Sequence, residues 1–257
     1  MRLYRQGVDD RRMLSLLGQT VDAVHEALSV VEDWRPLTER PTQYAIDLVA
    51  DSAALEVLAR SGVGVLSEES GLHAPTDATS RVTVVVDPVD GSTNASRGVP
   101  WYATSLCALD EEGPWVAVVA NQATGERFEA VRGGGARLNG KPIVASGCIS
   151  LADAMVGISG MPRGHPGWRQ FRALGAAALD LCAVACGRLD AYLDTSDGIH
   201  GAWDYLGGML ICHEAGAVVA EMGGRDLVVI EHDARRAPVA AATTALLDQL
   251  MAAARKP

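Results

Sequence analysis

Two carboxylates and several small polar residues follow directly on an apolar segment, in the string Asp87-Pro88-Val89-Asp90-Gly91-Ser92-Thr93-Asn94. Pro88 has a fixed φ and no backbone N–H, so it interrupts a strand and lets both carboxylates converge at the strand's end. Gly91 permits a positive φ or a close approach of the backbone to a ligand. Ser92 and Thr93 suit the start of a helix, where free N–H groups favour an anion. Carboxylates beside such a corner fit a phosphate only with cations between them, and an ordinary polar turn is the alternative.

Further acidic positions can join this site. Glu68 ends a short apolar segment, whereas its neighbour Glu69 fits a solvated position. Asp47 and Asp51 stand four residues apart on a helical segment. Like charges at that spacing repel by about 0.2–0.5 kcal/mol unless a cation lies between them, and an exposed face is the alternative, above all for Asp51. Asp204 opens an apolar helix, so it can cap that helix, bind a metal, or do both.

Oxygen ligands of this kind suit Mg²⁺, which binds carboxylates and retains water molecules. Two such cations about 4 Å apart can clamp a phosphoryl group, acidify an attacking water and neutralise the leaving alkoxide. Zinc is not indicated, because no ligand-like spacing is found among His73, His165, His200, His213 and His232. Ser92 has no evident histidine partner in sequence, so water is a better nucleophile than this serine.

These residues need strands and helices to position them. Val82–Val86 is an unbroken β-branched run, typical of a buried strand that delivers the first aspartate. Val63–Leu66 predicts a short strand before the glutamate pair, after a helix over Tyr44–Arg60. Apolar residues at helical spacing predict an opening helix over Met13–Val31.

The rest of the chain predicts more elements of both kinds. Strands are expected at Ala103–Leu109, Trp115–Ala120, Arg127–Val131, Val218–Val219, Leu227–Ile230 and Pro238–Ala241, with a hairpin turn at Gly133–Gly135. Buried helices are expected over Leu174–Cys186 and Trp203–Glu214, and a last helix from Thr243. This succession predicts a layered fold of helices and sheets. We expect one unit over 1–257, with a soft division near Ser146–Asp153 into 1–150, the metal-site half, and 151–257.

The composition excludes several classes of protein. A formal net charge of -10 argues against general nucleic-acid binding, which needs basic surface. The sequence has no uninterrupted apolar stretch of about eighteen residues, so no membrane span is expected. The charged N-terminus lacks the apolar core of an export signal. Buried free thiols are the expectation for Cys107, Cys148, Cys182, Cys186 and Cys212. We therefore expect a cytoplasmic protein without nucleic-acid or membrane partners.

Taken together, the motifs resemble the inositol monophosphatase family, which belongs with fructose-1,6-bisphosphatase to the lithium-sensitive, metal-dependent phosphatases. The likeness rests on Glu68-Glu69, the Asp87–Asn94 string and Trp203-Asp204, in the family's order. It also includes Gly125-Glu126-Arg127, Gly133–Gly140 and Ala183–Tyr192. It covers almost the whole chain from Asp47 onward, and Ser92 with the compact middle is most similar to archaeal-type enzymes that accept inositol phosphate and fructose bisphosphate. The resemblance implies a layered α/β/α/β/α sandwich.

The resemblance also implies a set of metal ligands. The first magnesium would bind Glu68, Asp87 and the backbone carbonyl of Val89. The second would bind Asp87, Asp90 and Asp204. Asp47 with Glu68 would lie at a weaker third position, so two or three Mg²⁺ ions are expected per site.

Catalytic and substrate-binding roles follow from the same resemblance. Ser92 would orient the attacking water together with Asp47, with Glu68 also in the catalytic set. Gly91 and Ser92 would offer backbone N–H groups to the phosphate. The substrate itself would also be contacted by Ala177, Asp194 and Asp204.

The chain departs from the family's pattern at several positions. Asp51 stands where the family often has Glu, and Ser159–Trp168 is shorter than in animal inositol phosphatases. Between Asp194 and Asp204 there is no Arg or Lys, although dual-activity relatives carry basic residues there that suit a second phosphate. The positive charge for a second phosphate could instead come from Arg163, Arg169 and Arg172, on another side of the site.

We therefore expect magnesium-dependent hydrolysis of a small phosphorylated metabolite by water, with inositol monophosphate as the first substrate. Fructose-1,6-bisphosphate is the second, followed by histidinol phosphate or a nucleoside 3'-phosphate. A non-catalytic protein that binds metal or a phosphometabolite is the alternative of another class. The family also implies a homodimer and inhibition by lithium.

Overall fold

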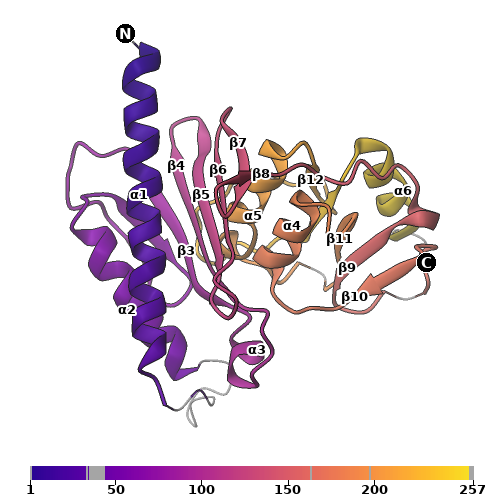
Figure 1. Ribbon diagram of the computed structural model, residues 1–257, viewed down its shortest axis with the longest axis horizontal. Helices are drawn as coiled ribbons and strands as arrows, with labels where there is room; N and C mark the ends of the chain where they lie inside the picture. Colours follow the sequence, from indigo (N-terminus) through magenta and orange to yellow (C-terminus); the bar gives the residue numbers. More distant parts are fainter. Residues whose placement is uncertain (1, 33, 35–43, 163, 197, 255–257) are drawn as a thin grey trace.

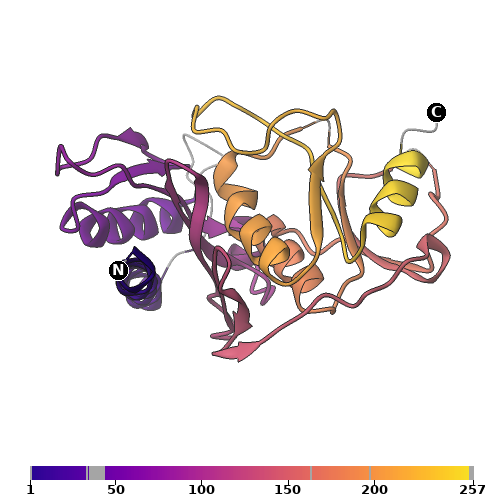
Figure 2. The ribbon, with the colours of Figure 1, turned by 90° about the horizontal axis from the view of Figure 1, so that it is seen from above.

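The computed structural model describes residues 2–32, 34, 44–162, 164–196 and 198–254. Within them, helices and sheets alternate in layers (Figure 1). Both views show one sheet beside the first two helices, two helices between the sheets, and a last helix outside the second sheet (Figure 1, Figure 2). The predicted α/β/α/β/α sandwich is therefore confirmed. None of the helices in this part of the chain combines the length and apolar character that a membrane crossing requires.

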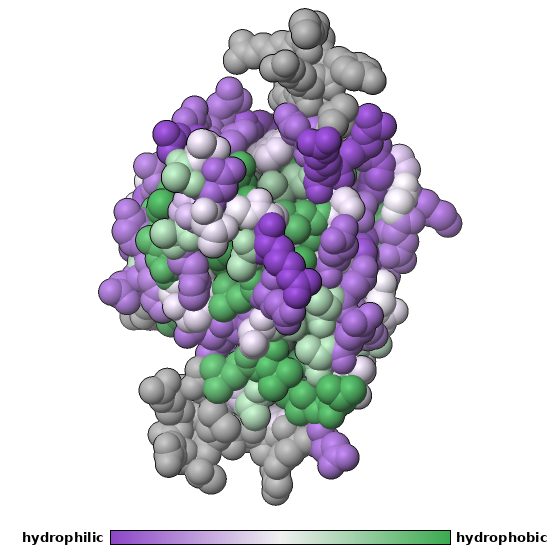
Figure 3. Space-filling model, turned by 90° about the vertical axis from the view of Figure 1, so that its left-hand side faces the viewer, coloured by the Kyte–Doolittle hydropathy of each residue, from purple (hydrophilic) through white to green (hydrophobic). Residues whose placement is uncertain are grey.

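The outer helical layer consists of α1 (Arg2–Ser29) and α2 (Ala45–Ala59). The helically spaced residues of the predicted opening helix, including Leu17, Val21 and Val24, are buried against the sheet. Helix α1 begins before the predicted Met13: the segment holds Gly7 but no proline that would end a helix, although its first turns lack an apolar stripe. On the outward face of this layer, hydrophilic residues surround hydrophobic patches at the centre and near the lower edge (Figure 3).

The larger sheet has eight strands in the order β2-β1-β3-β4-β5-β6-β7-β8. The strands are β1 (Gly64–Ser67), β2 (Gly71–His73), β3 (Thr83–Asp90), β4 (Ala103–Asp110), β5 (Gly113–Asn121), β6 (Arg127–Val131), β7 (Gly135–Leu138) and β8 (Lys141–Pro142). Only β1 and β3 pair in parallel within this sheet, so their carboxyl ends lie at the same edge. Along β3, Val84 and Val86 pack towards α1 and α2, whereas Val85 packs towards the middle layer. Because both faces are covered, this strand is an unbroken apolar run.

The middle layer consists of α4 (Ala177–Ala185) and α5 (Ala202–Glu214), whose side chains fill one core between the two sheets. Two glycines let α5 lie close to its neighbours. A Cβ atom at Gly207 would lie 2.9 Å from Ser105 Oγ, and one at Gly208 would lie 2.6 Å from Leu181 Cβ. Larger residues there would separate α5 from the sheet or from α4.

The smaller sheet has the order β10-β9-β11-β13-β12. Its strands are β9 (Met155–Ser159), β10 (Gln170–Arg172), β11 (Ala191–Asp194), β12 (Val218–Glu221) and β13 (Pro238–Ala241). Helix α6 (Thr244–Ala254) and the short 3-10 turn η1 (Leu151–Asp153) pack on its outer side. Helices α4 and α5, from the second half of the chain, share a core with the larger sheet, which comes from the first half. The soft division near residue 150 therefore stays a prediction.

The predicted strand at Leu227–Ile230 is wrong. This segment is irregular, and its Leu227 carbonyl accepts a hydrogen bond from Tyr205 Oη at 2.8 Å. Strand β12 pairs with β13 at the edge of the sheet, and Leu227–Ile230 forms no ladder with the free side of β12. The apolar run instead belongs to the connection that crosses from β12 back to β13. All five cysteines are free, as expected, but Cys148 and Cys186 are only half-buried.

Candidate active site

An irregularity in β3 brings two aspartates to one face of the sheet. Asp87 pairs with Ser105 and Asp90 pairs with Ala103, so three steps along β3 match two steps along β4. Residues three apart in a regular strand point to opposite faces, and the extra residue of this bulge restores them to the same face. Pro88 was expected to interrupt the strand, but the strand continues through it to Asp90 with this shift in register.

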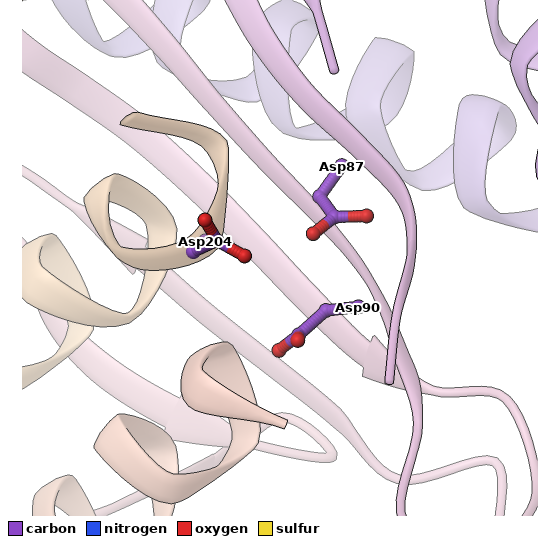
Figure 4. Close-up of side chains that lie close together, drawn as sticks. All are labelled: Asp87, Asp90 and Asp204. Carbon is purple, nitrogen blue, oxygen red and sulfur yellow. The ribbon is translucent and has the colours of Figure 1, made fainter. Parts of the chain in front are cut away.

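Asp204 completes the carboxylate cluster from the other side. One carboxylate oxygen each from Asp87, Asp90 and Asp204 lies within 4.8 Å of the others. The two side chains from β3 and the one from the start of α5 point into a common space (Figure 4). Asp204 Oδ2 also accepts a hydrogen bond of 2.6 Å from Gly201 N, so the residue caps α5 while its other oxygen stays available.

Each of these aspartates is held by backbone groups. Asp90 Oδ2 accepts a hydrogen bond of 2.7 Å from Ala178 N at the start of α4, beside the predicted substrate residue Ala177. Asp87 Oδ1 accepts one of 3.0 Å from Val89 N. The second oxygen, Asp87 Oδ2, is buried and has no hydrogen-bond partner among the described residues. A buried carboxylate oxygen without a partner is costly unless a cation neutralises it.

Glu68 borders the cluster at the end of β1. Burial, together with the neighbouring Asp204 and Glu69 carboxylates, raises its pKa to about 8. Burial likewise raises the pKa of Asp90 to about 7, with Asp204 adding to the effect. The pKa of Asp87 lies well above its ordinary value, because of burial and then Glu68. Carboxyl groups that disfavour one another's charge so strongly form a site that fits divalent cations.

Asp47 and Ser92 meet beside this cluster although they are far apart in sequence. Ser92 Oγ lies 2.5 Å from Asp47 Oδ1 and 2.8 Å from the Val89 carbonyl. Its single proton can be donated to only one of them at a time. Asp47 Oδ2 accepts a hydrogen bond of 2.9 Å from Tyr44 N and so caps α2. Burial raises the pKa of Asp47 to about 6, against the lowering effect of the Ser92 bond.

Gly91 adopts a left-handed conformation that the chain requires at this point. Its φ is 89°, and it precedes the five-residue helix α3 (Ser92–Ser96). An added Cβ would lie 3.1 Å from the Trp101 carbonyl and 3.2 Å from Ala176 Cβ. Asn94 holds the same surroundings together, donating from Nδ2 to the carbonyls of Trp101 and Leu174. A side chain at position 91 would therefore strain the loop and crowd its neighbours.

Two predicted residues have surroundings that the sequence pattern did not indicate. Asp51 is 5 % exposed and accepts a hydrogen bond from Ser67 Oγ, so the exposed position expected for it is wrong. The bond holds the residue that directly precedes Glu68. Asp194 is buried at the end of β11, where Oδ1 accepts a hydrogen bond of 2.8 Å from Ser196 N.

His200 is a residue of this region that the sequence pattern missed. Its Nε2 lies 3.6 Å from Asp194 Oδ2 and 3.2 Å from Tyr192 Oη, and its Nδ1 lies 3.6 Å from Asp204 Oδ2. Burial alone would lower the pKa of His200, but the carboxylates of Asp204, Asp194 and Asp90 raise it to about 9. A test for zinc-like spacing overlooks such a residue. The usable signal was the histidine between two candidate carboxylates, four positions before Asp204.

Two of the three arginines expected to supply extra charge, Arg169 and Arg172, are not part of the cluster. Arg172 is exposed and bonds to Gln170 Oε1 and to the Phe171 carbonyl. Arg169 is also exposed, and Arg163 lies outside the described residues. A different arginine approaches instead: Arg235, from the β12–β13 connection, has its guanidinium carbon 5.1 Å from the centre of the Trp203 ring.

A groove of about 690 Å³ lies elsewhere, beside α1 and the β4–β5 turn. Its lining includes Met13, Leu16 and Trp115 and none of the cluster's carboxylates. The residues suited to chemistry therefore gather at the carboxylate cluster between β3 and α5, and this groove is a separate feature.

Comparison with known proteins agrees with this geometry. The sequence profile of the inositol monophosphatase family matches residues 22–256. An inositol-1-monophosphatase of Mesorhizobium japonicum is 41% identical over 187 residues, which are 66% of this chain and 68% of that protein. A fructose-1,6-bisphosphatase/inositol-1-monophosphatase of Archaeoglobus fulgidus is 34% identical over 235 residues, covering 86% and 88%. A Pyrococcus horikoshii structure, described as having similarities for inositol-1 monophosphatase, superimposes with a TM-score of 0.80 at 26% identity, covering 96% and 98%.

Proposed function

Because this chain belongs to the inositol monophosphatase family, and is thus a metal-dependent phosphoric monoester hydrolase, we propose that it hydrolyses inositol monophosphate with Mg²⁺. The observation that carries the proposal is the cluster of Asp87, Asp90 and Asp204, with the buried Asp87 Oδ2 lacking a hydrogen-bond partner among the described residues. Carboxylate oxygens crowded in this way are suited to a hard cation with oxygen ligands, whose binding displaces the protons that the carboxyl groups otherwise hold. The Mesorhizobium japonicum and Archaeoglobus fulgidus relatives support the choice of substrate.

We assign the metal ligands to residues on α2, β3 and α5 and to Glu68, which directly follows β1. Glu68, Asp87 and the Val89 carbonyl would hold one Mg²⁺, and Asp87, Asp90 and Asp204 a second. A weaker third position would lie between Asp47 and Glu68. When bound, such cations supply Lewis-acid chemistry, acidifying a water molecule and stabilising a leaving oxygen.

Asp47 and Ser92 are the residues suited to handle the attacking water. In their short hydrogen bond, Ser92 donates to Asp47, so the serine oxygen keeps lone pairs that can accept a hydrogen bond from water. With the donor and acceptor fixed, the pair would orient a lone pair of the water towards the phosphorus atom. Asp47 is itself held by Tyr44 N, which limits the freedom of its carboxylate.

The remaining residues would bind the substrate. Backbone N–H groups of Gly91 and Ser92 would contact the phosphate oxygens. Ala177, at the start of α4, and Asp194, at the end of β11, would contact the hydroxyl-bearing ring, together with Asp204. Carboxylates such as that of Asp194 accept hydrogen bonds from hydroxyl groups, so they favour a polyol over an apolar leaving group.

Fructose-1,6-bisphosphate is a second candidate substrate. Arg235 over Trp203 is a cation beside the residue that precedes Asp204, and a second phosphate would need such a partner. The dual name of the Archaeoglobus fulgidus relative supports the same candidate. Histidinol phosphate and a nucleoside 3'-phosphate are lower-ranked candidate substrates. The alternative of another class is a non-catalytic protein that binds metal or a phosphometabolite without turnover.

A homodimer in the cytoplasm is the corresponding proposal for assembly and location. The family supports the dimer, and five free cysteines fit a reducing compartment. Light scattering on the purified protein would report twice the mass of the 27.0 kDa chain for a dimer and that mass for a monomer.

Initial rates of phosphate release would test the function. Inositol 1-phosphate, fructose-1,6-bisphosphate, histidinol phosphate and a nucleoside 3'-phosphate are compared at equal concentration, each with Mg²⁺ and with EDTA. The proposal expects the fastest release from inositol 1-phosphate and none in EDTA. Faster release from the bisphosphate would favour the second candidate. Tight binding without release would favour the non-catalytic alternative.

A further inference from the structure

A chain of hydrogen bonds leads from the outer helix to the loop that carries the two aspartates of β3. Thr104 Oγ1 donates to the Pro88 carbonyl at 2.9 Å, and Gln122 Nε2 donates to Thr104 Oγ1 at 2.8 Å. Gln122 Oε1 lies 2.9 Å from His25 Nδ1 on α1. Thr104 is fully buried and Gln122 nearly so, whereas His25 is exposed. These hydrogen bonds thus join α1, the turn after β5, and β4 to the peptide between Asp87 and Asp90.

The chemistry of the end group sets the direction of every bond. The Pro88 carbonyl can only accept a hydrogen bond, so Thr104 must donate its single hydroxyl proton to it. The oxygen of Thr104 then accepts from the amide NH₂ of Gln122. This orients the Gln122 amide so that its carbonyl faces His25, whose Nδ1 must carry a proton. The hydrogen bonds therefore fix the orientation of the Thr104 hydroxyl, the Gln122 amide and the His25 ring.

The position of the chain indicates what it does. Pro88 lies within the bulge of β3, where the regular ladder to β4 is interrupted. The two carboxylates on either side of it are buried, and one oxygen of each lies within 4.8 Å of the other, so like charges there repel without a cation and favour a more open loop. A buried hydrogen bond from Thr104 to the carbonyl between them opposes that opening.

We propose that Thr104, Gln122 and His25 are positioning residues that hold the Pro88 peptide, and with it Asp87, Asp90 and the Val89 carbonyl, in the geometry that divalent cations require. None of the three belongs to the carboxylate cluster. They act through the loop: the hydroxyl of Thr104 fixes the peptide, the amide of Gln122 fixes the hydroxyl, and His25 fixes the amide. The inference rests on the proposed function of the cluster as a metal site.

The test uses a matched pair of buried threonines. Thr104→Val removes the hydroxyl at nearly constant volume, Thr104→Ser restores it, and Thr20→Val is the control. Thr20 is equally buried and donates to the Leu16 carbonyl at 2.9 Å, but it lies on α1 and takes no part in the hydrogen bonds that lead to Pro88. Binding of Mn²⁺, a spectroscopic substitute for Mg²⁺, is measured on the full chain without substrate, together with the Mg²⁺ concentration for half-maximal phosphate release.

We expect Thr104→Val to weaken Mn²⁺ binding about 10-fold or more, the effect typical of groups that orient metal ligands. Thr104→Ser should bind as the wild type does, and Thr20→Val should lose stability without losing affinity. Gln122→Met, further along the chain, should weaken binding less than Thr104→Val, and His25→Ala less again. Gln122→Met decides the matter if Thr104→Val does not fold.

The two failures are distinguishable. Wild-type protein that binds no Mn²⁺ would contradict the proposed metal site itself. Wild-type protein that binds Mn²⁺ while Thr104→Val and Gln122→Met bind equally well would overturn the positioning role and leave the metal site standing. Equal losses in Thr104→Val and Thr20→Val would also overturn it, since a general loss of packing would then explain both.

Discussion

Replacing Asp90 by Asn should have opposite effects on the stability of the metal-free protein and on its activity. The amide has nearly the same volume, and its oxygen can still accept the hydrogen bond from Ala178 N. The ligand oxygens of the cluster lie within 4.8 Å of one another, and two like charges at that separation repel by roughly 3 kcal/mol at an effective dielectric constant of about 20. Since the new NH₂ group must also find a partner, we expect a gain in unfolding free energy of about 1–3 kcal/mol at pH 8 in EDTA.

The sign follows from the protonation of Asp90. Its pKa is raised from 3.8 to about 7, so the wild-type fold loses stability as pH rises from 3.8 through 7 and the group ionises. The advantage of Asp90→Asn in denaturant titrations should therefore be absent near pH 4 and complete near pH 8. Asp248→Asn, an exposed substitution on α6, serves as the control and should show no such pH dependence.

Activity should change in the other direction. Without the Asp90 charge the second cation loses a ligand, and phosphate release with Mg²⁺ should fall at least about 100-fold, as expected when several kcal/mol of transition-state stabilisation are lost. Full activity in Asp90→Asn, or a metal-free protein less stable than the wild type at pH 8, would refute the reasoning.

Three further predictions concern the water, the helix packing and the response to pH. Ser92→Ala should lower kcat about 100-fold while Mn²⁺ binding stays within about 3-fold, because the role proposed for this serine is to orient water and not to bind metal. Ser96→Ala is the control, and equal losses in both variants would count against the proposed role. Gly208→Ala should lower the unfolding free energy by about 1–3 kcal/mol, since the new Cβ would lie 2.6 Å from Leu181 Cβ; an unchanged denaturation midpoint would contradict this close packing. Burial alone would raise the pKa of Glu221, but hydrogen bonds lower it from 4.5 to about 2, so the wild type should exceed Glu221→Gln in stability by about 2 kcal/mol at pH 7. That difference should shrink as pH falls from 4.5 towards 2, and a constant difference in denaturation experiments would disprove the assignment.

Most of the cluster could be predicted from the sequence because its residues mark the ends of elements. Asp87 follows an apolar β-branched run, and Asp204 opens an apolar helix, so each position follows from a local pattern. The layered fold followed from the order of these elements. The bulge that turns Asp87 and Asp90 to the same face could not be predicted, since it depends on pairing with β4, which is a contact between segments.

Long-range contacts account for the remaining differences. Asp51 is buried because Ser67 lies against it, and helical spacing alone indicates only that it shares a face with Asp47. His200 gains its place between Asp194 and Asp204 from the meeting of β11 and α5. The apolar run Leu227–Ile230 has strand composition, but it pairs with no described strand, and composition alone does not show whether a partner will pair with it.

Strands β9 and β11 also could not be predicted from the local sequence pattern. They have five and four residues, too few to show a period against neighbouring apolar helices. Their identity as strands comes from pairing with each other and, for β11, with β13.

The most direct test of the account is phosphate release from inositol 1-phosphate by one sample in three successive states: as purified, after removal of metal with EDTA, and after Mg²⁺ is restored in excess. The account predicts activity that disappears with EDTA and returns with Mg²⁺ in the wild type, but does not return in Asp90→Asn. Release that persists after complete metal removal, or that Mg²⁺ restores equally in both proteins, would contradict the claim that these carboxylates perform the reaction by holding divalent cations.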